Sequence, residues 1–387
     1  MAVIFTVGKF FLLKMQQLNY VGDRKFAWFD VPEPKLTRSD QVIGKPIVMG
    51  RCDADVTAWL PGISTVLAAG NHQRVVDPMV NLSLGETPYR TPFPIGHESV
   101  CEIVAVGSEV SLFTVGDRAV VPWSISCGKC ANCRRKLTTH CQNSGDTLIS
   151  GWGFGAAMGP WGGMITDYIR VPFADHMLTK IPSDVDPLMF ASASDNLADA
   201  WRTVAPELKR NPEQGVCVLG GGAKSIGIYA AALAVALGSP NVVYLDFDQK
   251  RLDIASAYGA HAIEIPKKLD QLEVDLAELG EFHIGVEAAS SIAGFNFLFD
   301  HIACGGTVFG IGFYFFSEQP INYFTMYGKS LTLKIGISHP ATDLEDIVSF
   351  VLENNFDPRL VQTHVFDYYE ADKVYGKAST KLVLVRD

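Results

Sequence analysis

The chain has 387 residues, more than one hydrophobic core usually accommodates, so two domains are expected. Hydrophobic residues make up 48% and charged residues 19% of the sequence, a composition typical of soluble globular proteins. The net charge of -10 excludes the basic surface of a nucleic-acid-binding protein, and no apolar run reaches the roughly 18 residues that span a membrane.

Residues 1–14 are predicted to form an N-terminal extension, and a first hairpin is expected from Met15 onward. The extension is apolar, but it has neither a basic leading region nor a small-residue cleavage site, so it does not fit a secretory signal. We therefore expect a cytoplasmic, reducing environment, in which clustered cysteines indicate metal binding rather than disulfide bonds.

Short β-type runs separated by turn signals continue to about residue 190, and they predict a mostly antiparallel, barrel-like domain. They include QVIGKPIVMG (41–50), SVCEIVAVGSEV (99–110), DRAVVPW (117–123) and ITDYIRVPFAD (165–175).

Four of the eight cysteines lie in one loop-like stretch of this part, with the spacing C-x2-C-x2-C-x7-C. They are Cys127, Cys130, Cys133 and Cys141. Two-residue gaps let neighbouring thiolates converge on one ion, and a closed tetrahedral sulfur site favours a structural zinc. The alternatives are an iron–sulfur cluster, for which the sequence has no electron-transfer context, and four unrelated reduced cysteines.

From Asn211 onward, strands and helices alternate, which predicts a parallel sheet with right-handed crossovers and an α/β fold class. GVCVLGGG (215–222) reads as a buried strand that runs into a turn, followed by an apolar helix ending at Gly238. Further strands are expected at 241–248, 283–290, 305–314 and 331–338. The last stretch, a helix followed by strands, is predicted to return to the first domain.

The glycine-rich turn has the pattern of a dinucleotide-binding loop, in which backbone approaches the pyrophosphate and a helix N-terminus attracts its charge. Two glycines fit the first motif positions, but the third falls on Ser225 and the next glycine is Gly227, so the turn carries extra length. The candidate contacts are Gly220, Gly221, Gly222, Ser225, Ile226 and Gly227.

Asp246 ends the second strand, 24 residues after Gly222, near the distance at which an acidic residue binds the adenosine ribose. Its charge would repel a 2′-phosphate, so NAD is expected rather than NADP. Arg251, on the following helix, is a further candidate contact, although a solvated helix face is its simpler interpretation.

The four-cysteine loop, the sequence GHES (96–99) before it and the glycine-rich turn after it resemble, in this order, the zinc-dependent medium-chain alcohol dehydrogenases. The resemblance implies a GroES-like catalytic domain over residues 15–194 and 338–387, interrupted by a Rossmann dinucleotide-binding domain over residues 195–337. It also implies a cytosolic homodimer or homotetramer, and a second, catalytic zinc beside the structural one.

The resemblance further implies the ligands of that catalytic zinc, which needs three protein ligands and one open position. Cys52 in the C-x-x-D motif RCDAD and His97 in GHE are the first two. The third is Asp195 in an SD pair that opens a helix, as in formaldehyde-dehydrogenase-like members, with Asp199 as its competitor. Glu98 is expected to bond around the ligands or to approach the metal transiently.

One position departs from the family pattern, because Ala54 stands where a serine or threonine usually begins a proton relay. Alanine cannot carry a proton, so the usual relay is expected to be broken or to pass instead through Thr57, Asp55, His72 or water. By resemblance, three residues at strand ends flank the nicotinamide, with ordinary strand termini as the alternative: Ala288, Gly310 and Ile311.

Together these patterns predict a zinc-dependent oxidoreductase that interconverts a small-molecule alcohol and an aldehyde or ketone by hydride transfer with NAD(H). Two alternatives stay open: a zinc-poor enone or quinone reductase of the same superfamily, and a scaffold that binds NAD without catalysis. Residues 60–95 are an insertion relative to short family members, expected to border the substrate site or to contribute to a subunit contact.

Overall fold

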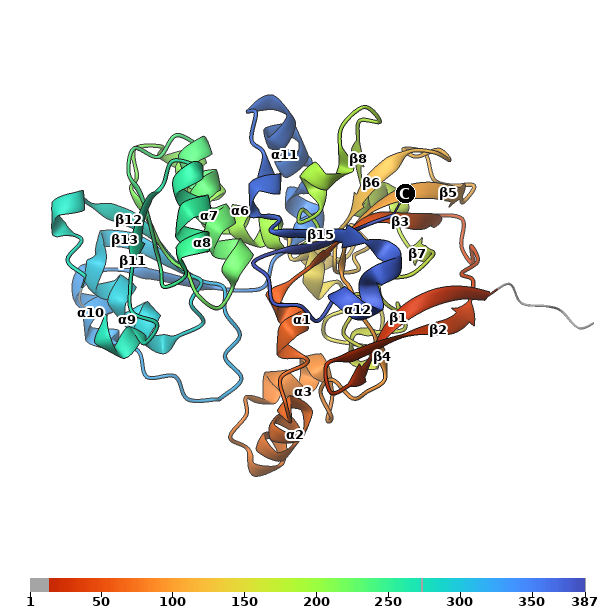
Figure 1. The fold of residues 1–387 in the computed structure, drawn as a ribbon, viewed down its shortest axis with the longest axis horizontal. Coiled ribbons are helices and arrows are strands. Elements are labelled where there is room, and N and C mark those ends of the chain that lie inside the picture. The colour runs from red at the N-terminus through yellow and green to blue at the C-terminus, as the bar shows by residue number, and fades with distance from the viewer. Residues whose placement is uncertain (1–13, 273, 387) are drawn as a thin grey trace, which may run out of the picture.

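The strands form one wholly parallel sheet and two sheets that are antiparallel apart from a single parallel pair at one edge; the structure is a computed structural model that describes residues 14–272 and 274–386 (Figure 1). The predicted N-terminal extension lies outside the described residues except for Lys14, where the first strand begins. None of the helices within these two ranges combines the length and the apolar character that a membrane crossing needs.

The antiparallel part begins with a hairpin of β1 (Lys14–Gly22) and β2 (Lys25–Pro32), which confirms the hairpin predicted from Met15. Strand β4 (Phe93–Pro94) joins this hairpin. A larger sheet has the order β15-β16-β3-β5-β6-β8, with β7 also paired to β3. Its strands are β3 (Val42–Arg51), β5 (Glu98–Val106), β6 (Arg118–Val121), β7 (Ile169–Val171), β8 (Thr179–Ile181), β15 (His364–Asp367) and β16 (Leu382–Val385). Because β16 pairs with β3, the end of the chain returns to this sheet as predicted.

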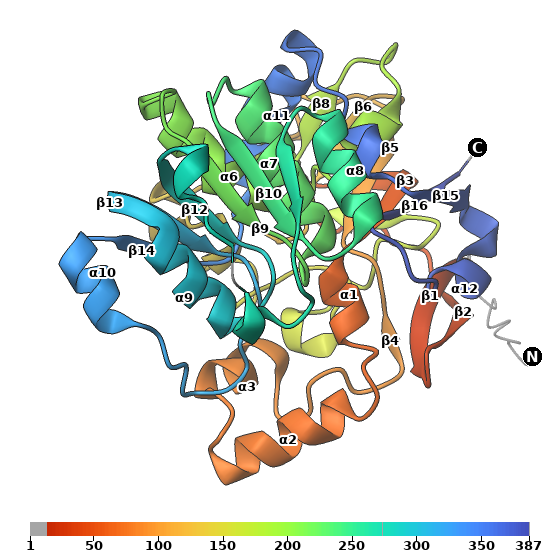
Figure 2. The ribbon, with the colours of Figure 1, turned by 60° about the vertical axis from the view of Figure 1, so that its left-hand side comes forward.

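The parallel sheet has the order β11-β10-β9-β12-β13-β14. Its strands are β9 (Val216–Leu219), β10 (Val242–Asp246), β11 (His261–Glu264), β12 (Phe282–Glu287), β13 (Ile302–Gly310) and β14 (Thr332–Ile335). They alternate with α7 (Lys224–Ala236), α8 (Gln249–Ala257), α9 (Ile292–His301) and α10 (Tyr323–Lys329) (Figure 2). The order reverses between β9 and β12, as in doubly wound dinucleotide-binding sheets. The predicted α/β fold class is confirmed.

Helix α6 (Asn196–Arg210) connects the two parts. One hydrophobic cluster runs from Val48 and Val100 of the antiparallel sheet, through α6, to Val218 of β9 and the buried residues of α7. Helix α11 (Pro340–Glu353) adds its own buried face to the same cluster. This shared core fixes the start of α6 relative to both sheets.

The insertion at residues 60–95 forms α2 (Ile63–Gln73) and α3 (Pro78–Leu84), which project beyond the short helix α1 (Asp53–Thr57) (Figures 1 and 2). The turn between α2 and α3 bonds to the loop after β13. Backbone hydrogen bonds run from Asp77 to Phe315 (2.8 Å) and from Ser317 to Val75 (3.1 Å), with a β-bridge between Val76 and Phe316. Segments 75–77 and 315–317, called the bridge below, therefore link the two parts of the chain.

Candidate metal centres and dinucleotide site

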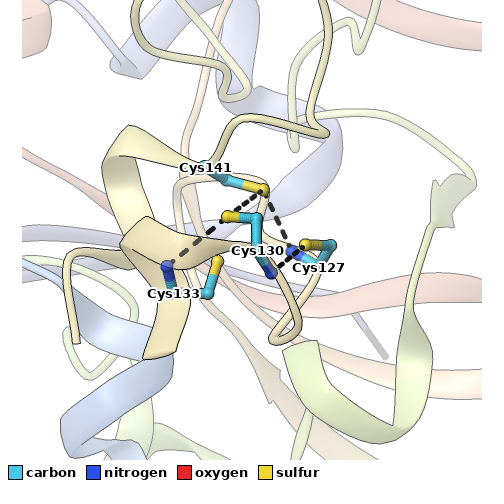
Figure 3. Close-up of side chains that lie close together, drawn as sticks. All are labelled: Cys127, Cys130, Cys133 and Cys141. Atoms are coloured by element: carbon cyan, nitrogen blue, oxygen red, sulfur yellow. Dashed lines mark hydrogen bonds between the residues drawn. The ribbon is translucent and has the colours of Figure 1, made fainter. Parts of the chain in front are cut away.

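The four cysteines of the loop face a common centre (Figure 3). Helix α4 (Ala131–Arg134) begins directly after Cys130 and carries Cys133. All four sulfur atoms lie within 4.8 Å of one another, and those of Cys130 and Cys141 are 4.0 Å apart. A zinc ion with bonds of about 2.3 Å separates tetrahedral thiolates by about 3.8 Å, so the set fits one zinc ion.

Backbone amides point at these sulfur atoms, at distances of 3.3 to 3.5 Å. Such donors favour the charged thiolate, which is the form that binds a metal. Burial raises the pKa of Cys130, but the amides of Cys133 and Gln142 outweigh it and bring that pKa down to about 6. Burial raises the pKa of Cys133, and it raises the pKa of Cys141 to about 12, so these two thiolates depend on a bound cation for their stability.

A second cluster brings together Cys52, His97 and Asp195, whose ligand atoms also lie within 4.8 Å of one another. Cys52 follows β3, His97 precedes β5, and Asp195 precedes α6. Nε2 of His97 lies 3.4 Å from Oδ2 of Asp195. A tetrahedral zinc with bonds of about 2.0 Å would separate such atoms by roughly 3.3 Å, so the three side chains fit a single ion.

The Cys52 thiol is only 4% exposed, and burial together with the charge of Asp195 raises its pKa to about 12. Its sulfur accepts hydrogen bonds from the Ala54 amide at 3.3 Å and from Nδ2 of Asn196 at 3.0 Å. A buried thiolate beside a carboxylate is costly unless a cation lies between them. This donor set therefore fits a divalent cation, whose charge Cys52 and Asp195 would balance.

The His97 imidazole is held from two directions. Its ring stacks on Phe154 with centroids 4.7 Å apart, and Nδ1 lies 3.2 Å from Oδ1 of Asp55, out of line for a full hydrogen bond. Burial lowers the pKa of His97, but the charge of Asp55 and the contact with Asp195 outweigh it and hold that pKa well above its usual value. Asp55 thus faces the nitrogen that points away from the cluster and leaves Nε2 turned toward it.

Asp195 occupies the N-cap position of α6, but its side chain makes no capping hydrogen bond. Oδ1 instead accepts a hydrogen bond from the Ser338 hydroxyl at 3.3 Å, and that hydroxyl accepts one from Nε1 of Trp123 at 3.1 Å. The competing Asp199 pairs with Arg202, and burial raises its pKa to about 6. The geometry therefore favours Asp195 over Asp199 as a ligand.

Glu98 is fully buried and lies outside the ligand cluster. It accepts hydrogen bonds from Nζ of Lys381 and from the backbone amide of Asn196, the latter at 3.0 Å. Sequence reasoning did not select either partner. Asn196 is next to Asp195 in the sequence, and Lys381 stands at the start of the apolar run KLVLV, where a lysine is unusual unless it is paired.

Of the residues expected to replace the proton relay, only Asp55 lies in contact with a predicted metal ligand. The Thr57 hydroxyl donates to the Asp53 carbonyl within α1 at 3.4 Å, and His72 is exposed on α2. Asp55 lies beside His97, but it also accepts from the Cys52 amide at 3.2 Å. Among the described residues no hydrogen bond connects Thr57 or His72 to the ligands, so a relay through either one stays a prediction.

The glycine turn is packed too closely for side chains. A Cβ on Gly220 would collide with the Tyr244 hydroxyl, and a Cβ on Gly222 would lie 2.6 Å from the Ser290 hydroxyl. A Cβ on Gly227 would lie 3.1 Å from that of Ala288, so Gly227 holds α7 against the sheet, the role of the third motif glycine. Ser225, the alternative third position, is buried and turned inward.

The residues expected at the nicotinamide lie beside this turn. The Ala223 amide donates to the Ala288 carbonyl at 2.8 Å, and the Ile311 amide donates to the Glu287 carbonyl at 3.1 Å. Gly310 ends β13 directly before Ile311. The carboxyl ends of β9, β12 and β13 therefore meet where the strand order reverses, the usual place for a dinucleotide.

Asp246 ends β10 as predicted, but its carboxylate is fully buried and fully engaged. Oδ1 accepts from the amides of Phe247 and Asp248, Oδ2 accepts from the Tyr244 hydroxyl, and Arg251 donates to both oxygens. A carboxylate offers about four acceptor sites, so none is left here for ribose hydroxyls. Arg251 is 4% exposed rather than solvated. The solvated interpretation of Arg251 is wrong, since the pair stabilises the end of β10, whereas the ribose contact of Asp246 stays a prediction that requires one of these hydrogen bonds to be exchanged.

A carboxylate from the antiparallel part meets the first turn of α7. Oδ2 of Asp53 accepts from the Lys224 amide at 2.8 Å, and Oδ1 accepts from Nζ of Lys224 at 2.9 Å. Helix N-termini attract anions, and here Asp53 supplies one. Because Asp53 follows Cys52, this contact ties the metal cluster to the helix of the glycine turn.

Two family models match the chain. The alcohol dehydrogenase GroES-like domain matches residues 39–183, and the zinc-binding dehydrogenase matches residues 225–353. The first match covers most of the antiparallel part, and the second covers the parallel sheet from α7 onward.

Individual relatives extend this similarity over most of the chain. L-threonine 3-dehydrogenase of Serratia proteamaculans is 30% identical over 385 residues, which covers 96% of this chain and 100% of the relative. A Mycobacterium tuberculosis protein named as a probable zinc-binding alcohol dehydrogenase is 27% identical over 322 residues, covering 83% and 80%. The structure of alcohol dehydrogenase TADH from Thermus sp. ATN1 has a TM-score of 0.79 at 22% identity, covering 96% and 100%, and shows the shared fold. The formaldehyde-dehydrogenase-like branch stays a prediction. The chain belongs to the zinc-binding medium-chain alcohol dehydrogenase family of oxidoreductases.

Proposed function

We propose that this chain interconverts an alcohol and a carbonyl compound, with a catalytic zinc at Cys52, His97 and Asp195 and with NAD(H) as the hydride carrier. The observation that carries the proposal is the convergence of these three side chains, from distant segments, within 4.8 Å. A bound zinc supplies the Lewis acidity that makes an alcohol hydroxyl easier to deprotonate, and NAD supplies the hydride acceptor.

The chain's own residues prepare the site for this chemistry. Cys52 and Asp195 would balance the charge of a divalent ion, Asp55 turns His97 toward it, and Ser338 fixes one oxygen of Asp195. His97 is 1% exposed, whereas the Asp195 side chain is 15% exposed. We propose that substrate approaches from the side of Asp195.

We propose that NAD binds at the glycine turn, with its pyrophosphate near the N-terminus of α7. The contact of Asp53 with Lys224 would then rearrange or give way as the pyrophosphate arrives. Arg251 supports NAD over NADP, because its guanidinium is already paired with Asp246 and is not free to bind a 2′-phosphate.

Metal analysis together with turnover tests this function. The wild type is expected to hold two zinc ions per chain, and Cys52→Ala one, with turnover reduced at least about 100-fold because the Lewis acid is lost. Turnover is assayed with NAD and NADP on primary and secondary alcohols, including L-threonine, which the relatives' names suggest. One zinc in the wild type with reduction of enones would instead indicate the zinc-poor reductase. Dinucleotide binding without turnover on the whole panel would indicate a scaffold.

We further propose that the chain forms a homodimer or homotetramer through strand β14. Among the described strands β14 pairs with β13 alone, which leaves its other edge open, and Ile335 on this strand is 70% exposed. Open edges offer unpaired backbone groups to another strand. Helix α10, just before β14, adds exposed aromatic rings at Tyr323, Phe324 and Tyr327.

A further inference from the structure

Asn196, the first residue of α6, places its side chain between the metal cluster and the dinucleotide helix. Nδ2 donates to the Cys52 sulfur at 3.0 Å and to Oδ2 of Asp195 at 3.2 Å. Oδ1 accepts from Nζ of Lys381 at 2.5 Å and from the Ser225 hydroxyl at 2.9 Å. An amide has two N–H donors and two acceptor lone pairs, so this fully buried side chain uses all its bonding capacity.

The amide can take only one orientation in these surroundings. After a flip, its NH2 group would face the Lys381 ammonium, and its oxygen would face the Cys52 sulfur and the Asp195 carboxylate. Each contact with a charged group would then be repulsive. Lys381 is itself held by Glu98, so the orientation of the amide is fixed by a buried ion pair.

A hydrogen bond to a ligand sulfur has two effects. It restricts the direction in which the sulfur points, and it withdraws electron density from the thiolate, which leaves a bound cation more Lewis acidic. The Ala54 amide also donates to Cys52, but as part of the α1 cap. Asn196 is therefore the side chain that links the Cys52 sulfur to the Asp195 carboxylate.

Ser225 extends this link to the glycine turn. It lies in the first turn of α7, between Gly222 and Gly227, in the stretch that lengthens the dinucleotide motif. Its hydroxyl is buried, and among the described residues its side chain hydrogen-bonds to Asn196 alone. A dinucleotide that binds at this turn changes the surroundings of one partner of the amide.

We propose that Asn196 is a positioning residue that aims the Cys52 sulfur and the Asp195 carboxylate at the catalytic metal and, through Ser225, couples that metal to the dinucleotide turn. The inference rests on the proposed metal site. If the Asn196 side chain served only to pack the start of α6, it would not need hydrogen bonds to both proposed ligands, to Lys381 and to Ser225 of α7.

Cobalt bound at the Cys52 site tests the proposal, because a thiolate on Co²⁺ produces a charge-transfer band. The difference between wild type and Cys52→Ala isolates the band of this site. Asn196→Ala is expected to weaken cobalt binding there about 10- to 100-fold, the usual effect of losing a ligand's outer partner. Its band should move to longer wavelength, because the thiolate keeps more electron density. Asn196→Ser retains a shorter hydrogen-bond donor, so its cobalt affinity and band position should lie between those of the wild type and Asn196→Ala.

Ser225→Ala tests the coupling separately. Without dinucleotide its band should match that of the wild type, and the band shift that NAD causes in the wild type should become smaller. Retention of metal by the four-cysteine loop serves as the folding control for every variant. If Asn196→Ala fails that control, Asn196→Ser is judged by the same affinity and band criteria.

Three results would count against the inference. An unchanged cobalt affinity and band in a folded Asn196 variant would overturn it and leave the proposed function standing. An undiminished NAD-induced shift in Ser225→Ala would overturn the coupling. A wild type with the same cobalt spectrum as Cys52→Ala would overturn the metal site, and the inference with it.

Discussion

At the residue scale, Glu287 places a buried carboxyl at the end of β12, beside the glycine turn. It accepts hydrogen bonds from the Ser291 amide at 3.0 Å and from the Tyr314 hydroxyl at 2.8 Å. Burial raises its pKa to about 7 although these donors lower it. The unfolded chain loses this proton at lower pH than the folded one, so the folded state loses stability as pH rises through this range.

Glu287→Gln removes this ionisation and keeps the side-chain shape. Below about pH 4.5 the carboxyl is protonated in both states, and between 4.5 and about 7 only the unfolded state ionises. The free energy of unfolding of the wild type, relative to the variant, is therefore expected to fall by on the order of 3 kcal/mol as pH rises across this window. Denaturant titrations at several pH values measure it. The exposed Glu281→Gln is the matched control and should follow the wild type; a Glu287→Gln curve parallel to it would contradict the prediction.

Residues with local partners or with a place in a family motif were accessible to sequence reasoning, and the other residues with distant partners were not. The four-cysteine spacing lies within 15 residues, whereas Lys381 is 283 positions from Glu98 and Ser338 is 143 positions from Asp195. Arg251 is only five positions from Asp246, but the direction of its side chain depends on how α8 packs against β10. Its role was therefore misjudged despite its proximity.

At the scale of elements, the four-cysteine loop (127–141) has little packing of its own. Its cysteines form a separate cluster against which Phe173 packs, and α4 has four residues, too few to be stable alone. The loop also contacts the segment before α11, because the Thr139 hydroxyl donates to the Ser338 carbonyl at 2.6 Å. The Ser338 hydroxyl in turn donates to Asp195, so a change in the conformation of this loop would also affect the position of a proposed catalytic ligand.

Cys133→Ser is expected to lose one zinc per chain and to lower the midpoint of thermal unfolding by on the order of 5–10 °C, since the metal supplies the loop's folding energy. Turnover should fall as well, because Ser338 is displaced. Metal content, calorimetry and activity measure the three effects. Cys304→Ser changes an exposed thiol on β13 and should leave all three unaltered. A Cys133→Ser protein with two zinc ions and an unshifted midpoint would be inconsistent with a structural metal here.

Elements with regular patterns were predicted well, and the insertion was not. Strands β9 and β10 are wholly buried runs bounded by turn signals, which makes them recognisable in the sequence. Helix α2 instead begins directly after Gly62, an N-cap residue with a left-handed backbone and no side chain to cap the helix, so the usual start signal is missing. The turn after α2 bonds to segment 315–317, far away in the sequence, and no local pattern encodes that contact.

At the scale of the whole molecule, the open edge of β14 leads to a prediction about assembly. Ile335→Lys places a charge on the exposed edge, where natural sheets use lysine to prevent pairing. The variant is expected to have a lower molar mass than the wild type in light scattering. Val115→Lys, on an equally exposed apolar residue of the antiparallel part, is the matched control and should keep the wild-type mass. Identical masses for all three proteins would exclude β14 as the interface.

The bridge between segments 75–77 and 315–317 restricts how far the antiparallel and parallel parts of the molecule can move apart. The polypeptide crosses between the two parts near residues 195 and 338, and the contact of Asp53 with Lys224 also joins them. The bridge adds a further link, only three residues beyond Gly312. Opening the junction on that side either breaks two backbone hydrogen bonds, at about 1–3 kcal/mol in total, or drags α2 and α3 along with the parallel sheet. The helical insertion and the parallel sheet are therefore mechanically coupled on that side, so a substitution that stiffens or loosens the insertion also changes the cost of separating the two parts there.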